Sequence, residues 1–140
     1  MQAAIALLIG TILLGLSALH VYWAATGKSP GAAVIPEVAG RRTFEPTRLS
    51  TVAVAVALAC AALAVAARSG LFPVPVPAAL SAWACGLVGA AFLLRSIGEF
   101  RLVGFFKSVR DTPFARMDTR VYSPLCLALG LGSLWLALAL

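Results

Sequence analysis

Side chains that exchange protons are scarce in this chain, and most of them lie in short segments beside long apolar runs. The candidates for acid–base chemistry are His20, Glu37, Glu99 and Asp118. Cationic and aromatic residues accompany them and could hold a ligand, and they are Tyr22, Trp23, Arg95, Arg101, Phe105, Lys107 and Tyr122. Together these residue types predict a pocket for an amphiphilic ligand with an anionic or oxygenated head.

An ordinary membrane interface also accounts for each of these residues taken singly. Trp and Tyr collect at the membrane surface, and Lys and Arg mark the cytoplasmic side. Asp118 directly precedes an apolar run and would serve there as a helix N-cap. Arg95 and Glu99 lie one helical turn apart and would form a structural ion pair. The set as a whole favours a functional site, because ionisable groups are costly within or beside membrane spans.

Metal and cofactor chemistry finds little support in the sequence. The three cysteines, Cys60, Cys85 and Cys126, lie in separate apolar runs and form no C-x-x-C pair. A single histidine builds neither a zinc site nor a haem site with two histidine ligands. No Asp-rich motif is present to hold magnesium. We therefore expect no metal and no other cofactor.

The composition indicates the environment that must position these residues. The chain has 140 residues, of which 61% are hydrophobic and 11% charged, and its mean hydropathy is +0.99. Soluble domains are about half apolar and about a quarter charged, so the lipid bilayer must solvate much of this chain. The net charge of +6 would suggest nucleic acid in a soluble protein. Here the basic residues adjoin apolar runs, so no nucleic-acid partner is expected.

Four apolar runs predict an all-α fold, a bundle of four transmembrane helices in one domain spanning residues 1–140. A helix of about 20 residues crosses the hydrocarbon core, and the runs cover residues 3–25, 49–67, 78–106 and 121–140. The third helix is expected to carry its last turns beyond the apolar core. The first run is read as an uncleaved helix, since Met1 and Gln2 supply no basic segment of a signal peptide.

The distribution of basic residues predicts the orientation of the bundle. The first and third connections, with the ends of the helices beside them, hold ten Lys and Arg residues: Lys28, Arg41, Arg42, Arg48, Arg95, Arg101, Lys107, Arg110, Arg116 and Arg120. The opposite side holds only Arg68. The positive-inside rule then puts these connections in the cytoplasm and both termini outside, in a multi-pass protein of the cytoplasmic (inner) membrane.

Small residues repeat every fourth position on two of the predicted helices. The stripes are Ala53, Ala57 and Ala61 on the second helix, and Ala82, Gly86 and Ala90 on the third. Such stripes let helix backbones approach closely in lipid. They favour tight packing within the bundle, and a homodimer or a larger membrane complex stays open as an alternative.

Two stretches carry a resemblance to a known family. The first runs from Leu19 to Ala24 and is followed by Gly27 and by Val34-Ile35-Pro36. The second runs from Arg101 to Lys107 and leads into residues 114–126. Together they resemble the small bacterial membrane proteins grouped as domain of unknown function 3995. The resemblance implies a four-helix membrane protein, and it implies no activity and no catalytic role for any residue.

Two classes of function remain open from the sequence. The first is a membrane enzyme that acts on a lipid or isoprenoid at the inner leaflet by acid–base chemistry. One version is an isomerase or terpene-cyclase-like reaction, in which Glu37, Glu99 or Asp118 donates a proton and aromatic side chains face the cationic intermediate. The alternative is a non-catalytic accessory subunit or a small transporter component. A proton-coupled transporter is less favoured, because no carboxylate lies near the middle of a span.

Overall fold

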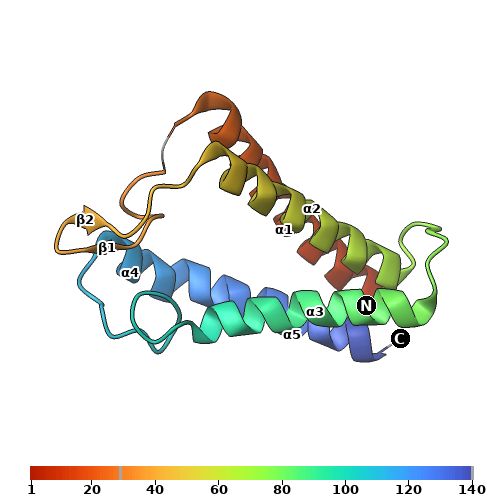
Figure 1. Cartoon of the computed structure of the whole chain (residues 1–140). Coiled ribbons are helices and arrows are strands. Elements are labelled where there is room, and N and C mark those ends of the chain that lie inside the picture. The colour runs from red at the N-terminus through yellow and green to blue at the C-terminus, as the bar shows by residue number, and fades with distance from the viewer. Residues whose placement is uncertain (29, 140) are drawn as a thin grey trace.

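The computed structural model describes residues 1–28 and 30–139, most of them in helices (Figure 1). The elements are α1 Gln2–Thr26, β1 Glu37–Val38, β2 Arg41–Arg42, α2 Arg48–Ser69, α3 Ala78–Ile97, α4 Pro113–Met117, the π-helical turn η1 Asp118–Tyr122, and α5 Ser123–Ala139. Elements α4, η1 and α5 follow one another without a break and form one long helix. Among the described residues, four helices are long and apolar enough to cross a membrane. The predicted all-α membrane bundle is confirmed.

The four long helices form two pairs. α1 packs most closely on α2, and α3 packs most closely on α5. Figure 1 shows the two pairs meeting near the chain termini and separating toward the opposite side. We call the first side the terminal end, which also holds the connection between α2 and α3. We call the other side the loop end, which holds the first and third connections, residues 27–47 and 98–112.

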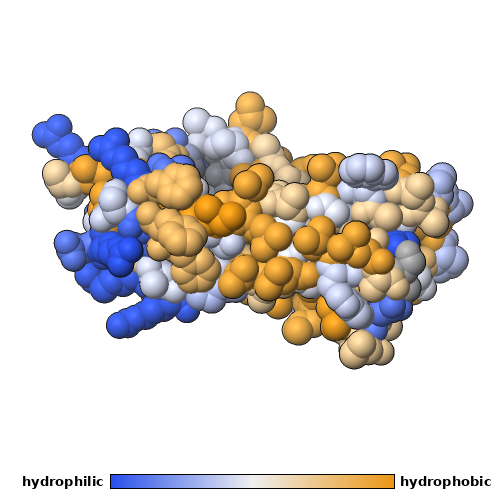
Figure 2. All heavy atoms as spheres, turned by 90° about the horizontal axis from the view of Figure 1, so that it is seen from below, coloured by the Kyte–Doolittle hydropathy of each residue, from blue (hydrophilic) through white to orange (hydrophobic). Residues whose placement is uncertain are grey.

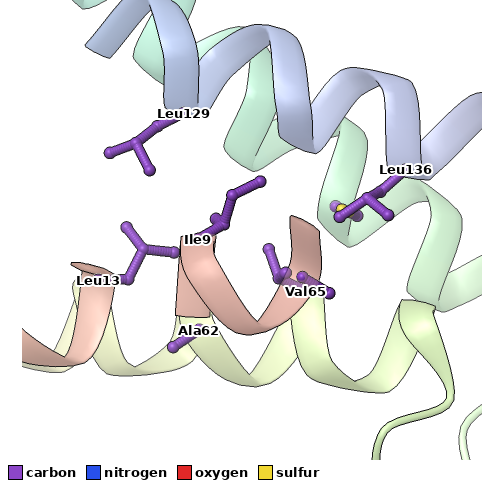
Figure 3. Close-up of a cluster of buried hydrophobic side chains, with 8 residues drawn as sticks. Ile9, Leu13, Ala62, Val65, Leu129 and Leu136 are labelled. Atoms are coloured by element: carbon purple, nitrogen blue, oxygen red, sulfur yellow. The ribbon is translucent and has the colours of Figure 1, made fainter. Parts of the chain in front are cut away.

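A shared apolar core joins the two pairs (Figure 3). All four long helices contribute to it, and its buried members are Ala6, Ile9, Leu13, Ala62, Val65, Cys85, Leu129 and Leu136. Most of these residues lie in the halves of the helices nearer the terminal end. Because lipid is as apolar as these side chains, close packing rather than the hydrophobic effect holds such helices together.

Two glycines set the closest approach between α3 and α5. A Cβ added at Gly89 would lie 2.9 Å from the backbone nitrogen of Leu134, and one at Gly130 would lie 2.9 Å from that of Leu93. The buried face of α3 carries Ser81, Cys85 and Gly89. The predicted stripe is displaced from this face by one residue: Ala82, Gly86 and Ala90 line a groove between α3 and α5.

The prediction that the third helix runs to Phe106 is wrong. α3 ends at Ile97, and the Gly98 N–H donates to the Leu94 carbonyl at 2.8 Å. Gly98 has a φ of 84° and Gly104 a φ of 91°, and a Cβ at Gly98 would overlap the Val103 carbonyl. The chain therefore reverses immediately after the helix, in a turn that requires glycine at both positions.

The fourth long helix begins earlier than the sequence predicted. The Thr112 hydroxyl accepts from the Ala115 N–H at 3.1 Å, and Pro113 occupies the first turn. Thr112 rather than Asp118 is therefore the N-cap, and Asp118 lies inside the helix at the start of η1.

The surface of the molecule differs between the loop end and the rest. In Figure 2 hydrophilic residues gather mostly at the loop end, beside a broad apolar belt.

Candidate functional site

The loop end holds a buried cluster of charges around Asp118. Arg95 donates to one carboxylate oxygen at 2.8 Å, and Lys107 donates to the other at 3.0 Å. The Gly104 N–H and the Ser123 hydroxyl also donate to the second oxygen, at 2.9 and 3.1 Å. We call these five residues the Asp118 cluster. Its carboxylate is fully buried, and two cations and two further donors satisfy it.

Lys107 is as deeply buried as its partner, with 1% of its surface exposed. Its ammonium group donates to Asp118, to the Gly104 carbonyl at 2.8 Å and to the Thr119 hydroxyl at 2.7 Å. A buried lysine is tolerated when all three of its hydrogens have acceptors, as they do here. Lys107 therefore joins the third connection to the long C-terminal helix.

The π-helical turn explains how Ser123 reaches Asp118. In η1 the Ser123 N–H donates to the Asp118 carbonyl, which is the spacing of five residues that defines a π turn. This wider turn brings the two side chains to the same side of the helix. Ser123 thereby contributes both its backbone N–H and its hydroxyl to Asp118.

The chemistry of the Asp118 cluster is that of a structural ion pair. A carboxylate held by two cations stays charged and is a poor proton donor. Arg95 pairs with Asp118 and not with Glu99, so the predicted Arg95–Glu99 pair is wrong. The reason is the early end of α3: Glu99 lies beyond it, is exposed, and accepts from the Leu102 N–H.

Two hollows adjoin each other between the first connection and the ends of α1 and α2. The polar hollow, about 260 Å³, is lined by charged and polar groups that include Lys28, Glu45 and Arg48. The apolar hollow, about 270 Å³, is lined by His20, Val34, Ile35, Phe44, Val54 and neighbours. The residues lining both are Trp23, Pro30, Pro46 and Thr51. We call the two hollows together the loop pocket.

One ring nitrogen of His20 takes part in a hydrogen bond within α1. Its Nδ1 lies 2.8 Å from the Leu16 carbonyl oxygen. A carbonyl only accepts, so the hydrogen of the neutral ring is on Nδ1, and Nε2 is an acceptor. The ring of Trp23 meets the imidazole edge to face, with ring centres 5.1 Å apart.

The charges of the polar hollow are unevenly paired. Glu45 lies 3.5 Å from Arg42, which offsets its charge. Lys28 lies over the ring of Tyr22, 5.8 Å from its centre. Arg48 lies against the end of α1, and its Nη2 is 3.1 Å from where a Cβ on Gly27 would stand. Within residues 1–28 and 30–139, no ion pair to a carboxylate is formed by Lys28 or Arg48.

The first connection closes the loop pocket by folding back on itself and contacting the other helix pair. Strands β1 and β2 pair antiparallel through a turn at Ala39 and Gly40, both with positive φ. The Tyr122 hydroxyl donates to the Ala33 carbonyl at 3.1 Å. Ile35, two residues further on, is 2% exposed. Tyr122 thus links the wall of the loop pocket to η1.

The structure divides the predicted site residues into three groups. Arg95, Lys107 and Asp118 come together in the Asp118 cluster. His20 and Trp23 come together in the loop pocket. Tyr22 lies beside Lys28, and Tyr122 is bonded to Ala33 next to the pocket wall, but neither tyrosine lines a hollow. Glu37, Glu99, Arg101 and Phe105 belong to neither group: Glu37 is half-buried in β1, and the other three are exposed.

Sequence reasoning missed the two cations of the loop pocket. Lys28 and Arg48 indicated only orientation, because they flank the first connection at opposite ends. The β1–β2 hairpin reverses the direction of the chain, and this reversal brings Lys28 and Arg48 to the same hollow. Gly40, a turn-forming residue between two short polar segments, was the available signal. In the part of the chain that the structure describes, no three His, Cys, Asp or Glu residues gather where they could hold a metal.

These features define a multi-pass membrane protein whose four apolar helices carry most of their charge at one end. Within that class, the chain belongs to the family described as "Protein of unknown function (DUF3995)", whose model matches residues 13–133. The match includes both stretches that carried the resemblance, which is confirmed. No curated protein and no solved structure matches the chain.

Proposed function

We propose that this protein binds an amphiphilic lipid or isoprenoid in the loop pocket and exchanges a proton with the bound molecule through His20, which lines the apolar hollow. The observation that carries the proposal is the pair of adjoining hollows. One is apolar, the other holds two cations, and four residues line both. Small-molecule sites combine an apolar lining with a few polar groups in this way.

His20 is the best-suited acid–base group of the loop pocket. Hydrogen bonding to Leu16 orients the ring and leaves Nε2 to receive a proton from a bound molecule. Trp23 lines both hollows and offers its ring to a cationic or apolar part of the ligand. Among the predicted acids, Asp118 is committed to its cations, so the proton-exchanging role is assigned to His20.

The positive-inside rule supports a cytoplasmic location for the loop end, which would make the ligand one of the inner leaflet. The test is a cysteine introduced at exposed Ser108, in a variant whose native cysteines are replaced by alanine. In intact cells, a maleimide that does not cross membranes should leave this cysteine unlabelled. Labelling before lysis would reverse the orientation.

Binding is tested by filling the apolar hollow. Val54 lines it, whereas Val56, on the same helix and also exposed, lines neither hollow of the loop pocket. The Val54→Trp variant should lose an amphiphile that co-purifies with the wild type in lipid nanodiscs, as detected by mass spectrometry. The Val56→Trp variant is the matched control and should retain it. Equal retention by both variants would count against the loop pocket.

The acid–base role is tested by His20→Asn. The side-chain amide nitrogen of asparagine can replace Nδ1 as donor to Leu16, but nothing replaces Nε2. A deletion strain that produces this variant should accumulate the same precursor as the empty deletion strain, while the variant still binds the amphiphile. A different outcome is that the wild type and the variant both bind the amphiphile, while neither changes the metabolite profile of the deletion strain. That outcome would indicate a non-catalytic accessory protein.

A further inference from the structure

Two cations of the loop pocket have no carboxylate partner among the described residues, and they indicate which head group the pocket takes. We propose that the polar hollow binds a phosphate monoester head, with Lys28 and Arg48 holding its two negative charges. This inference rests on the proposed function and names the class of ligand for the same site. It follows from the charge left in the polar hollow, from the placement of the two cations and from the hollow that adjoins it.

The charge of the polar hollow matches a dianion. Three charged residues line it, and Glu45 is offset by Arg42 at 3.5 Å. Lys28 and Arg48 therefore leave two positive charges, since within the described residues neither pairs with a carboxylate. A carboxylate head would neutralise one of them, whereas a phosphate monoester carries up to two charges at neutral pH.

The two cations approach the polar hollow from different helices. Lys28 follows the end of α1, and its ammonium group is held over the Tyr22 ring. Arg48 begins α2 and lies beside Gly27, whose φ of +66° and lack of a side chain leave room for the guanidinium. A planar guanidinium binds two oxygens of a phosphate at once, and an ammonium adds a compact charge beside it.

The apolar hollow makes the head part of a larger molecule. It adjoins the polar hollow through Trp23, Pro30, Pro46 and Thr51, and its other walls are mostly apolar. A free phosphate ion would leave this second hollow unused. The geometry therefore favours a phosphorylated lipid or isoprenoid over inorganic phosphate.

The experiment uses Trp23 as the reporter, because it lines both hollows. The chain has three tryptophans, and the Trp83→Phe/Trp135→Phe variant leaves Trp23 alone. This protein, in phosphatidylcholine nanodiscs, is titrated with dodecyl phosphate, with dodecanol and with inorganic phosphate. Trp23 fluorescence is recorded against probe concentration, expressed per bilayer lipid for the two amphiphiles.

Dodecyl phosphate should bind about tenfold more tightly than dodecanol, which has the same tail without the charge. Lys28→Gln and Arg48→Gln should each remove most of that difference and leave dodecanol binding unchanged. Arg101→Gln is the matched control, since Arg101 is an exposed cation outside the loop pocket. It should leave the binding of both amphiphiles unchanged.

Three results would overturn the inference. Equal affinity for dodecyl phosphate and dodecanol would leave the amphiphile pocket standing and remove the phosphate head. An equal loss from Arg101→Gln and Arg48→Gln would indicate general attraction to the basic surface. Tighter binding of inorganic phosphate than of dodecyl phosphate would make the site one for a free ion. The absence of a saturable response to any amphiphile would instead refute the proposed function itself.

Discussion

The two charged regions of the loop end differ in how their charges are satisfied. In the Asp118 cluster one buried carboxylate receives two cations and two neutral donors, so it has little left to offer a ligand. In the loop pocket, Lys28 and Arg48 line a hollow, and no described carboxylate pairs with them. The Asp118 carboxylate is thus held within the fold by its partners, whereas the described residues offer Lys28 and Arg48 no carboxylate partner.

The largest expected effect is on stability, from Asp118→Asn. The variant leaves Lys107 buried without a counter-charge, which should lower the free energy of unfolding by about 3–5 kcal/mol. Denaturant unfolding in detergent micelles measures it. The matched control, Glu99→Gln, changes an exposed carboxylate and should stay within about 0.5 kcal/mol of wild type. Equal stability of the two variants would remove the structural role of the Asp118 cluster.

A second prediction concerns the coupling between Lys107 and Asp118. Lys107→Met alone should destabilise the protein, because it deprives the buried carboxylate of one cation. Combined with Asp118→Asn, it should cost less than the sum of the single changes, by about 1–3 kcal/mol. The same unfolding measurement on all four proteins gives this coupling. Strict additivity would mean that the two groups do not stabilise each other.

A third prediction concerns the link between the two regions. Tyr122→Phe removes the hydroxyl that donates to Ala33 at 3.1 Å and should cost about 1 kcal/mol. Since Ala33 adjoins the pocket residues Val34 and Ile35, their amide hydrogens should exchange faster in the variant. Hydrogen exchange measured by mass spectrometry tests this. Unchanged exchange in the first connection would show that the Tyr122–Ala33 hydrogen bond does not stabilise it.

The smallest expected effect on stability is in the loop pocket. Lys28→Gln and Arg48→Gln should each change the free energy of unfolding by no more than about 0.5 kcal/mol, although both should weaken the binding of dodecyl phosphate. The unfolding measurement above tests this. A loss as large as that from Asp118→Asn would place these cations among the structural charges and end the distinction between the two regions.

Much of the fold follows from the sequence, because lipid imposes simple rules. Four apolar runs of sufficient length predict four helices, and the pattern of basic residues separates the loop end from the terminal end. The stripe of small residues that the sequence predicts on α3 lies one position away from the buried face of that helix. One position turns a helix by about 100°, and Ala82, Gly86 and Ala90 match the pattern as well as Ser81, Cys85 and Gly89 do.

The pairing of charges could not be predicted in the same way. Arg95 and Asp118 are 23 residues apart, and they meet only because the chain reverses at Gly98 and Gly104. A helical pattern that continued past Gly98 made Glu99 the nearer partner. Gly98 was a signal for the helix end, and Thr112-Pro113 was a signal for the start of the next helix. Used together, these two signals predict that α3 ends before Glu99, and the Arg95–Glu99 pair is then no longer expected.

α3 is shorter than the continuous helix formed by α4, η1 and α5, and this difference would make the protein sensitive to the thickness of the bilayer. The 20 residues of α3 span about 30 Å, which matches the hydrocarbon core, whereas the 27 residues from Pro113 to Ala139 span about 40 Å. The excess lies at the loop end and includes Asp118, which would lie at the level of the lipid head groups if α3 spans the hydrocarbon core. A thicker bilayer would draw this buried ion pair toward hydrocarbon. Membrane thickness would then act on the same charges that hold the third connection in place.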